Sequence, residues 1–246
     1  MSQSGPGKIR LFNDFFGVGD TLALTADTAD VGGGFYAGGE GFEDADAGIA
    51  GKDALSGVVT ITSANTDADT TFIGTHIGFD VGLMGTIVLE TRVQLPDLDT
   101  QEIFFGLTSI LSVDEQLEDI VINASATTIT MPADLAGFYL SDELTTVAGD
   151  WHAINSGGTA TATTTTTNGQ LNNVAVAGEW QVLRLEVTPI GTCRWYIDGE
   201  LKKTVTGAVS TSTDYAVVLA AGANTTQLNI FDCDYILVEA NRDWTV

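Results

Sequence analysis

The fold is decided by Trp180-Gln-Val-Leu-Arg-Leu-Glu-Val-Thr-Pro-Ile-Gly-Thr-Cys-Arg-Trp-Tyr-Ile-Asp-Gly-Glu-Leu-Lys-Lys-Thr-Val205. Polar and apolar side chains alternate over Trp180–Val187 and again over Cys193–Ile197, which is the period of a β-strand. Turn residues separate these two runs, and Asp198-Gly199 is a dipeptide favoured in two-residue hairpin turns. Since strands that are neighbours in sequence pair with little loss of loop entropy, this stretch predicts a three-stranded antiparallel meander ending at Glu200–Val205.

The same alternation recurs along the chain and predicts an all-β protein. In Thr86–Leu95, Ile87, Leu89 and Val93 share one face, and Pro96 ends the run because proline cannot donate to a sheet. No window shows a sustained apolar period of 3.6 residues, so helix is expected to be scarce. Further strands are predicted at Val58–Ser63, Glu102–Ser109, Gly137–Leu140, Gln181–Thr188, Cys193–Ile197, Tyr215–Ala220 and Leu228–Val238.

The other segments complete the predicted architecture. Ser112–Glu118 has the signature of a capping box and predicts one short helix or turn. Gly32–Lys52 and Asn155–Asn173 are predicted as loops, the second with an exposed hairpin tip or edge at its threonine run. Many short strands joined by turns indicate an antiparallel two-sheet β-sandwich or jelly roll. We expect residues 1–17 to form an N-terminal arm and residues 18–246 to form a single sandwich domain.

The charge of the chain excludes two classes of partner. The 246 residues include 33 Asp and Glu against 9 Lys and Arg, for a formal net charge of −24. Nucleic acid and anionic membrane surfaces are therefore not expected as partners, since both are bound through clustered basic residues. The first residues contain no apolar core of a signal peptide, and no stretch approaches a membrane span. We expect synthesis in a cytoplasm.

Two groups of residues resemble a known family. Trp180…Arg184-Leu-Glu-Val…Trp195-Tyr-Ile-Asp-Gly199, followed by Asp232-Cys-Asp-Tyr-Ile236, resembles the meander and closing strand of concanavalin A-like and laminin-G-like jelly rolls. The segments Lys8–Gly17, Ala136–Tyr139 and Ala240–Trp244 are similar to segments of structural proteins of tailed phages, many of them aquatic. The resemblance implies a capsid decoration protein on the surface of the virion, with the major capsid protein as its partner and with self-association into dimers or trimers.

A decoration protein acts by burying surface, and the arm supplies apolar anchors beside basic residues. The residues expected to contact the capsid or another subunit are Ile9, Arg10, Leu11, Phe12, Phe15, Phe16 and Trp244. The alternative is a glycan-binding module of a virion fibre or adhesin, with Tyr139 and Trp151 as exposed aromatic contacts. Trp180 and Trp195 lie in the meander and are expected in or near the core.

No catalytic residues are predicted, so the protein is not expected to be an enzyme. Some jelly-roll glycosidases carry a Glu-x-Asp-x-x-Glu strand that places both carboxylates on one face, and the chain has no such pattern. Glu115-Gln-Leu-Glu-Asp119 has the wrong spacing and is interpreted as a helix cap or solvated turn. There is also no Gly-x-Ser-x-Gly elbow for a nucleophile.

No metal or cofactor is predicted, and calcium is the alternative that stays open. Asn65-Thr-Asp67-Ala-Asp69 alternates oxygen ligands like the start of a calcium loop, but His76 stands where the bidentate Glu would be. The acids Glu43, Asp44 and Asp46 also lie close together in sequence. We expect both stretches to be solvated loops. Cys193 and Cys233 are expected as buried thiols, with a disulfide between neighbouring strands as the alternative.

Overall fold

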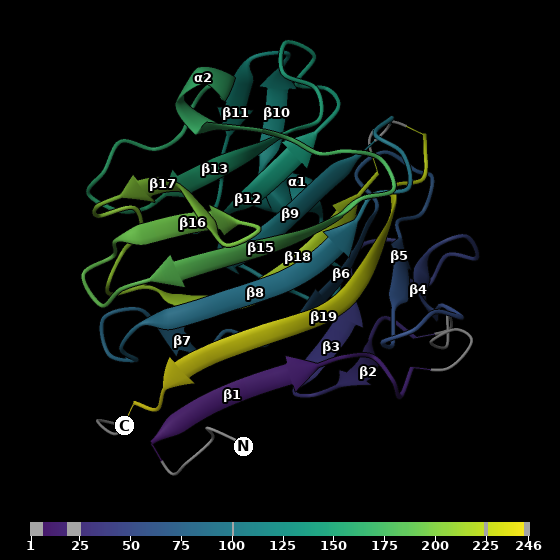
Figure 1. Ribbon diagram of the computed structural model, residues 1–246, viewed down its shortest axis with the longest axis horizontal. Helices are drawn as coiled ribbons and strands as arrows, with labels where there is room; N and C mark the ends of the chain where they lie inside the picture. Colours follow the sequence, from purple (N-terminus) through teal and green to yellow (C-terminus); the bar gives the residue numbers. More distant parts are fainter. Residues whose placement is uncertain (1–6, 19–25, 100, 224–225, 244–246) are drawn as a thin grey trace.

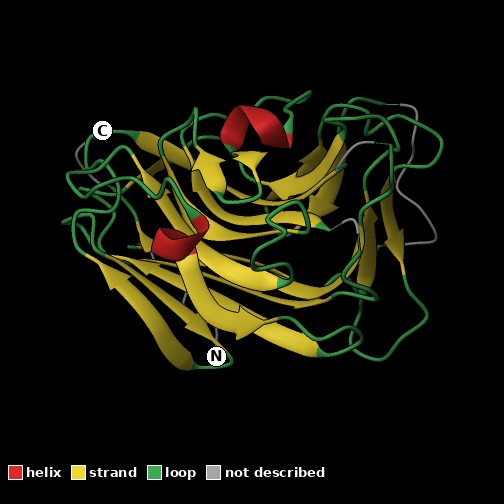
Figure 2. Cartoon of the chain, turned by 90° about the horizontal axis from the view of Figure 1, so that it is seen from above, coloured by secondary structure: helices red, strands yellow, loops and turns green. Residues whose placement is uncertain are grey.

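The chain folds into two antiparallel sheets that lie face to face (Figure 1). The computed structural model describes residues 7–18, 26–99, 101–223 and 226–243. Seen from above, the strands form curved layers, and the two helices are single turns (Figure 2). This confirms the predicted all-β sandwich with little helix. Within the described residues, no helix is long and apolar enough to cross a membrane.

The first sheet contains eight strands and includes the predicted meander. Its three consecutive strands lie side by side at one edge, in the order in which they occur in the sequence. Across the sheet the order is β17 (Glu200–Val205), β16 (Cys193–Ile197), β15 (Trp180–Val187), β8 (Ile87–Gln94), β19 (Ile230–Asn241), β5 (Val59–Thr62) and β4 (Gly48–Gly51), and β1 (Lys8–Asn13) also pairs with β19.

The second sheet contains nine strands and is buried on both faces along most of its length. All seven residues of two neighbouring inner strands, β9 (Glu102–Thr108) and β12 (Leu135–Ser141), are buried. Its order is β14 (Gln170–Val174), β13 (Asp150–Ser156), β12 (Leu135–Ser141), β9 (Glu102–Thr108), β18 (Asp214–Gly222), β6 (Thr70–Gly74), β3 (Phe35–Gly38) and β2 (Ala29–Gly32), and β7 (Phe79–Asp80) pairs with β18.

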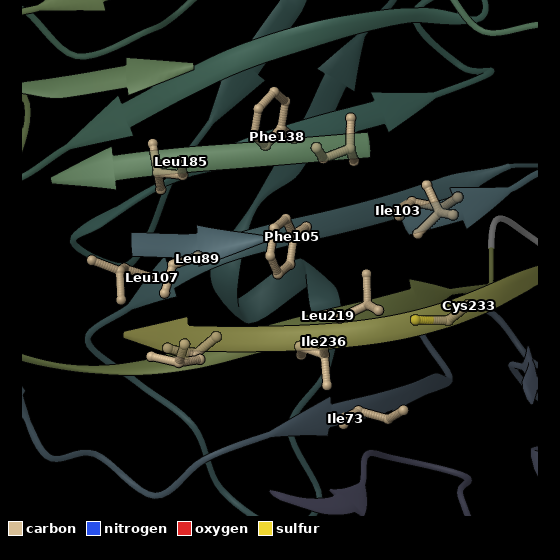
Figure 3. Packing of buried hydrophobic residues seen from close by; sticks show 14 of the residues in the cluster. Ile73, Leu89, Ile103, Phe105, Leu107, Phe138, Leu185, Leu219, Cys233 and Ile236 are labelled. Carbon is tan, nitrogen blue, oxygen red and sulfur yellow. The ribbon is translucent and has the colours of Figure 1, made fainter. Parts of the chain in front are cut away.

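The main core lies between the two sheets (Figure 3). Leu89, Leu185 and Ile236 of the eight-stranded sheet face Phe105 and Phe138 of the nine-stranded sheet, and all five are fully buried. Fully burying one such side chain contributes about 1.5–3 kcal/mol relative to leaving it exposed. Burial of this inner face is the main force that holds the sheets together.

Two tryptophans also join the sheets by hydrogen bonds. The indole N–H of Trp195 in the eight-stranded sheet donates to the carbonyl of Gly137 at 2.8 Å. The indole N–H of Trp151 in the nine-stranded sheet donates to Oε1 of Gln181 at 2.9 Å. Both rings are fully buried, so each bond satisfies a donor that would otherwise be left unpaired in the core.

A cover closes much of the outer face of the nine-stranded sheet. It comprises α1 (Leu117–Ile120) and the hairpin of β10 (Ile122–Ser125) and β11 (Thr128–Thr130). Side chains of the cover, among them Leu117, Ile120 and Ile129, form a second buried cluster with Phe104 and Tyr139 of the sheet. This sheet is therefore packed on both sides, whereas the cover does not extend to the outer face of the eight-stranded sheet.

Three segments differ from the prediction. The predicted loop Gly32–Lys52 contains β3 and β4, whose four-residue length and glycines hide any alternation. The predicted loop Asn155–Asn173 contains α2 (Thr166–Gly169) and the start of β14. At Ser112–Glu118 the Glu115 carboxylate accepts from the Ser112 backbone N–H at 2.7 Å, as in a capping box, but the contact closes a turn and the helix begins only at Leu117.

The structure corrects the expectation that residues 1–17 stand apart from the sandwich. Over Lys8–Asn13 the chain is a strand that pairs with β19 in continuous register, from Lys8 opposite Asn241 to Asn13 opposite Ile236. Ile9 and Leu11 pack against the core, because alternation turns them inward. The physical reason is that pairing satisfies the backbone groups of the segment while its apolar face is buried.

Candidate functional site

An open pocket with an aromatic wall lies at the β2–β3 edge of the nine-stranded sheet. Its volume is about 380 Å³, which is within the usual range for small-ligand sites. Residues from β2, β3, the segment after β6 and the loop before α1 line it: Thr28, Ala29, Asp30, Gly34, Phe35, Tyr36, His76 and Val113. We call this cavity the Tyr36–His76 pocket.

Glycines and strand alternation build the wall of the pocket. The hairpin between β2 and β3 turns through Gly32, Gly33 and Gly34, which have φ values of 85°, 68° and 92°. Such positive φ values suit glycine, so the tight turn depends on this run. In β3, Phe35 then points into the main core, and alternation turns Tyr36 to the outer face.

The pocket presents a stacked pair of rings. The rings of Tyr36 and His76 lie 4.8 Å apart with an interplanar angle of 22°. On its other side Tyr36 meets the buried ring of Phe72 edge-on, at 5.4 Å and 83°. Phe72 thus holds Tyr36 in position, while His76 stays exposed beside it. The Val113 carbonyl accepts from the Gly39 N–H at 2.7 Å, which fixes the loop before α1 against the end of β3.

The electrostatics around the pocket are acidic. Burial raises the pKa of the Tyr36 hydroxyl, and the nearby Glu115 raises it further. Asp30 lines the pocket, and its Oδ1 accepts from the Gly32 N–H at 2.8 Å. Tyr36 therefore stays a neutral phenol, and a ligand meets this hydroxyl beside the Asp30 carboxylate.

Under the cover lies a buried polar pair that solvent does not reach. The Tyr139 hydroxyl donates to Oε1 of Glu102 at 2.6 Å. Burial raises the pKa of Glu102 to about 8; the Tyr139 hydrogen bond opposes this shift, and the charges of Glu118, Glu143 and Asp142 add to it. Because the pair is closed off by the cover, we assign it to stability rather than to ligand binding.

The prediction that Tyr139 and Trp151 are exposed is wrong. Tyr139 and Trp151 are both fully buried. Tyr139 faces the outer side of its sheet, but the cover packs over it. Trp151 points inward and bonds to Gln181 across the core. The structure brings neither residue to the surface, so neither forms the exposed aromatic face that the sequence predicted.

Some of the predicted contact residues of the arm face the core and others face outward. Phe15 is buried, and Ile9 and Leu11 pack against the core, which removes these three as surface anchors. Arg10 and Phe12 lie on the outer face, and Phe16 is 73% exposed. Trp244 lies outside the described residues.

The candidate metal ligands do not converge. Within the ranges that the structure describes, no group of three or more His, Cys, Asp and Glu side chains is placed to hold a metal ion. In the Asn65–Asp69 loop, the Asp69 carboxylate turns back to accept from the Thr66 N–H at 3.2 Å. Cys193 and Cys233 are free and buried, and burial raises the pKa of both thiols.

Sequence reasoning missed Tyr36 and His76 because it assigned Gly32–Lys52 to a loop. The available signal was local: three glycines followed by Phe35-Tyr36, which is a tight turn leading into an aromatic pair. His76 carries no such signal, since only the pairing of β3 with β6 brings it beside Tyr36.

The sequence matches no protein-family model. It also matches none of the curated proteins. Similarity appears only in three dimensions.

Solved structures resemble the chain over nearly its whole length. A protein of unknown function from Shewanella oneidensis MR-1 has a TM-score of 0.65 at 12% identity, covering 100% of this chain and 92% of that one. The carbohydrate recognition domain of Emp47p has a TM-score of 0.57 at 10% identity, covering 98% and 99%. A carbohydrate esterase from the Shiga toxin-encoding bacteriophage phi24B has a TM-score of 0.53 at 16% identity, covering 91% and 98%.

These identities show a shared fold and no more. The similar structures include both a carbohydrate recognition domain and an enzyme, so the fold is common to binding and catalytic proteins. In fold, the chain is the predicted antiparallel two-sheet β-sandwich, a concanavalin A-like jelly roll.

Proposed function

We propose that the protein is a glycan-binding module whose binding site is the Tyr36–His76 pocket. The observation that carries this proposal is the pair of stacked rings beside an open cavity, on a sandwich that resembles a carbohydrate recognition domain. The C–H face of a sugar ring packs against an aromatic surface. The few polar groups around such a surface fix its orientation.

The polar groups of the pocket suit sugar hydroxyls. Asp30 accepts hydrogen bonds, the Tyr36 hydroxyl donates, and the His76 imidazole offers a donor and an acceptor. Val113, which is 41% exposed, adds an apolar rim. This combination of one wall of rings and two or three convergent polar groups is typical of small-ligand sites.

The charge of the surroundings selects neutral glycans. None of the nine strands of this sheet carries a lysine or arginine, and Asp30 lies in the pocket itself. A uronic or sialic acid residue would bring a carboxylate into this field and be repelled. A neutral hexose has no such penalty and is the sugar class we propose.

The geometry favours binding over turnover. The Tyr36 and His76 rings stack face to face, so no hydrogen bond passes between them to move a proton from one to the other. The pKa of Tyr36 is raised, which disfavours a phenolate base. We therefore propose no catalytic step at this site.

The test is a glycan array followed by calorimetry with variants of the pocket. Tyr36→Ala should abolish binding of the neutral glycans that the wild-type protein selects, and His76→Ala should weaken it. Tyr196→Ala is the matched control, since it removes a half-exposed tyrosine from the other sheet. Binding that survives Tyr36→Ala but is lost in Tyr196→Ala would overturn the assignment.

A location on a virion, with a capsid partner, remains a second proposal. It rests on the resemblance of the chain ends to phage structural proteins and on the exposure of Phe12 and Phe16, which are 40% and 73% exposed. Deleting residues 1–17 would remove a strand of the sheet, so point variants are the better test. Phe16→Ala should weaken binding to undecorated capsids, and undiminished binding would discard this attachment role.

A further inference from the structure

The basic residues of this acidic chain are gathered on one sheet. All nine lie in strands of the eight-stranded sheet or directly after them, and none lies in the nine-stranded sheet. Lys8 and Arg10 are in β1, Lys52 follows β4, and Arg242 follows β19. The basic residues of the molecule are therefore confined to the strands of one sheet and the residues directly after them.

On the outer face of this sheet the charges nearly balance. Alternation and pairing place six basic residues there: Lys8, Arg10, Arg92, Arg184, Arg194 and Lys52, which follows β4 and pairs with Asp232. Five acidic residues lie among them: Glu90, Glu186, Asp232, Asp234 and Glu239. The excess of acids in the chain, 33 against 9, thus lies elsewhere.

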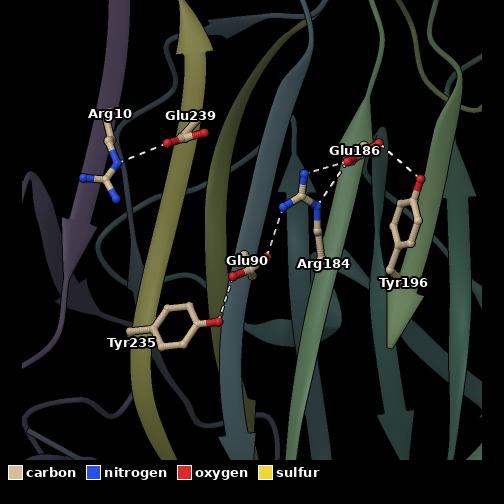
Figure 4. A network of polar contacts seen from close by, with 7 residues as sticks. All are labelled: Arg10, Glu90, Arg184, Glu186, Tyr196, Tyr235 and Glu239. Atoms are coloured by element: carbon tan, nitrogen blue, oxygen red, sulfur yellow. Dashed lines mark hydrogen bonds and ion pairs between the residues drawn. The ribbon is translucent and has the colours of Figure 1, made fainter. Parts of the chain in front are cut away.

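Ion pairs and hydrogen bonds link the charged side chains across the strands, in one group around Glu90, Arg184 and Glu186 and in a separate Arg10–Glu239 pair (Figure 4). Arg184 bonds to Glu186 at 2.7 Å and to Glu90 at 3.2 Å. The Tyr235 hydroxyl donates to Glu90 at 2.8 Å, and at the edge Arg10 pairs with Glu239 at 3.1 Å. These bonds hold long side chains in fixed positions, so little further side-chain entropy is lost when another surface packs on them.

Half-exposed aromatic side chains lie between the ion pairs. Arg92, itself paired with Asp234 at 2.7 Å, lies over the Trp180 ring at 4.7 Å. Phe12 and Tyr235 have ring centroids 6.2 Å apart. Tryptophan, tyrosine, phenylalanine and arginine are the residues enriched at the centres of protein interfaces.

We infer that this face is where a second copy of the chain docks, as an isologous dimer. Two copies that each carry a charge of −24 repel one another, and this repulsion is weakest where the local charge is close to zero. In an isologous contact the same patch meets itself across a two-fold axis, so a face that carries both signs of charge can set its basic residues against acidic residues of the second copy. Arg194 makes no ion pair within the described residues, and the second copy supplies its carboxylate.

The test measures the dimer dissociation constant by analytical ultracentrifugation. Arg194→Glu changes the face without breaking an ion pair of the folded chain, and it should raise the dissociation constant at least about tenfold. The matched control is Thr145→Glu with Ala148→Glu, which changes the charge equally at exposed positions after β12. The control should dimerise like the wild-type protein.

Three results would overturn the inference. These are a wild-type protein that stays monomeric at high concentration, a dimer that Arg194→Glu leaves unchanged, and a control that dissociates as much as the face variant. Circular dichroism of each variant verifies folding. None of these substitutions touches the Tyr36–His76 pocket. Glycan binding by the same variants is therefore a separate measurement, and its result bears on the proposed function and not on the dimer.

Discussion

Replacing Glu102 with glutamine should make the protein more stable at pH 8 than the wild type. Glu102 is 4% exposed under the cover, and burial raises its pKa from 4.5 to about 8. The amide of Glu102→Gln keeps an oxygen for the Tyr139 hydroxyl, now 2.6 Å from Oε1 of Glu102, and has no charge to bury. The variant thus isolates the cost of ionising this one group.

The direction of the pH dependence follows from the protonation of Glu102 in the folded and the unfolded chain. Below pH 4.5 Glu102 is protonated in both the folded and the unfolded protein, so it adds no pH dependence. Between pH 4.5 and 8 the unfolded chain ionises while the folded protein stays protonated, and stability falls as pH rises. Each unit of the shift is worth about 1.36 kcal/mol, so the full penalty above pH 8 is about 5 kcal/mol.

The assay is urea unfolding of both proteins at a series of pH values. The difference in unfolding free energy, Glu102→Gln minus wild type, should rise between pH 4.5 and 8 and level off above pH 8. Any cost of burying the amide is the same at every pH, and other carboxylates titrate alike in both proteins. A difference that does not change with pH would refute the reasoning.

Three further predictions follow from the core. Trp195→Phe removes the indole N–H that donates to the Gly137 carbonyl at 2.8 Å and should lower the free energy of unfolding by about 1–3 kcal/mol. An unchanged midpoint of urea unfolding would argue against this hydrogen bond between the sheets. Gly137→Ala would place a Cβ 2.5 Å from the Phe104 ring. The free energy of unfolding, followed by thermal melting, should fall by about 1–3 kcal/mol. Burial raises the pKa of the Cys193 and Cys233 thiols, so a thiol reagent should label them only on unfolding, and rapid labelling of the native protein would contradict their burial.

The eight-stranded sheet was predictable because one of its faces is covered by the core and the other is not. Ile87–Gln94 and Trp180–Val187 each alternate between buried and half-buried side chains, and this is the pattern that their sequences show. The predicted hairpin at Asp198-Gly199 was confirmed because its turn chemistry is local.

In the nine-stranded sheet the surroundings of the functional residues were not predictable, because this sheet is covered on both faces. Strand β12 is buried on both faces, so its sequence cannot show that a cover lies over Tyr139. The cover comes from residues 117–130, which directly precede β12 in the chain, and no alternation in either segment shows that they fold back over its outer face. The Tyr36–His76 pocket depends in the same way on the pairing of β3 with β6, which no local pattern encodes.

Proton NMR of the two histidines tests the central claim most directly. The chain has only two, and they differ in environment: His76 is exposed in the pocket, and His152 is fully buried in the nine-stranded sheet. Titration with a neutral saccharide that the array selects should shift the ring protons of His76 progressively and leave those of His152 in place. A saccharide that binds the protein without moving the His76 resonances would contradict the account.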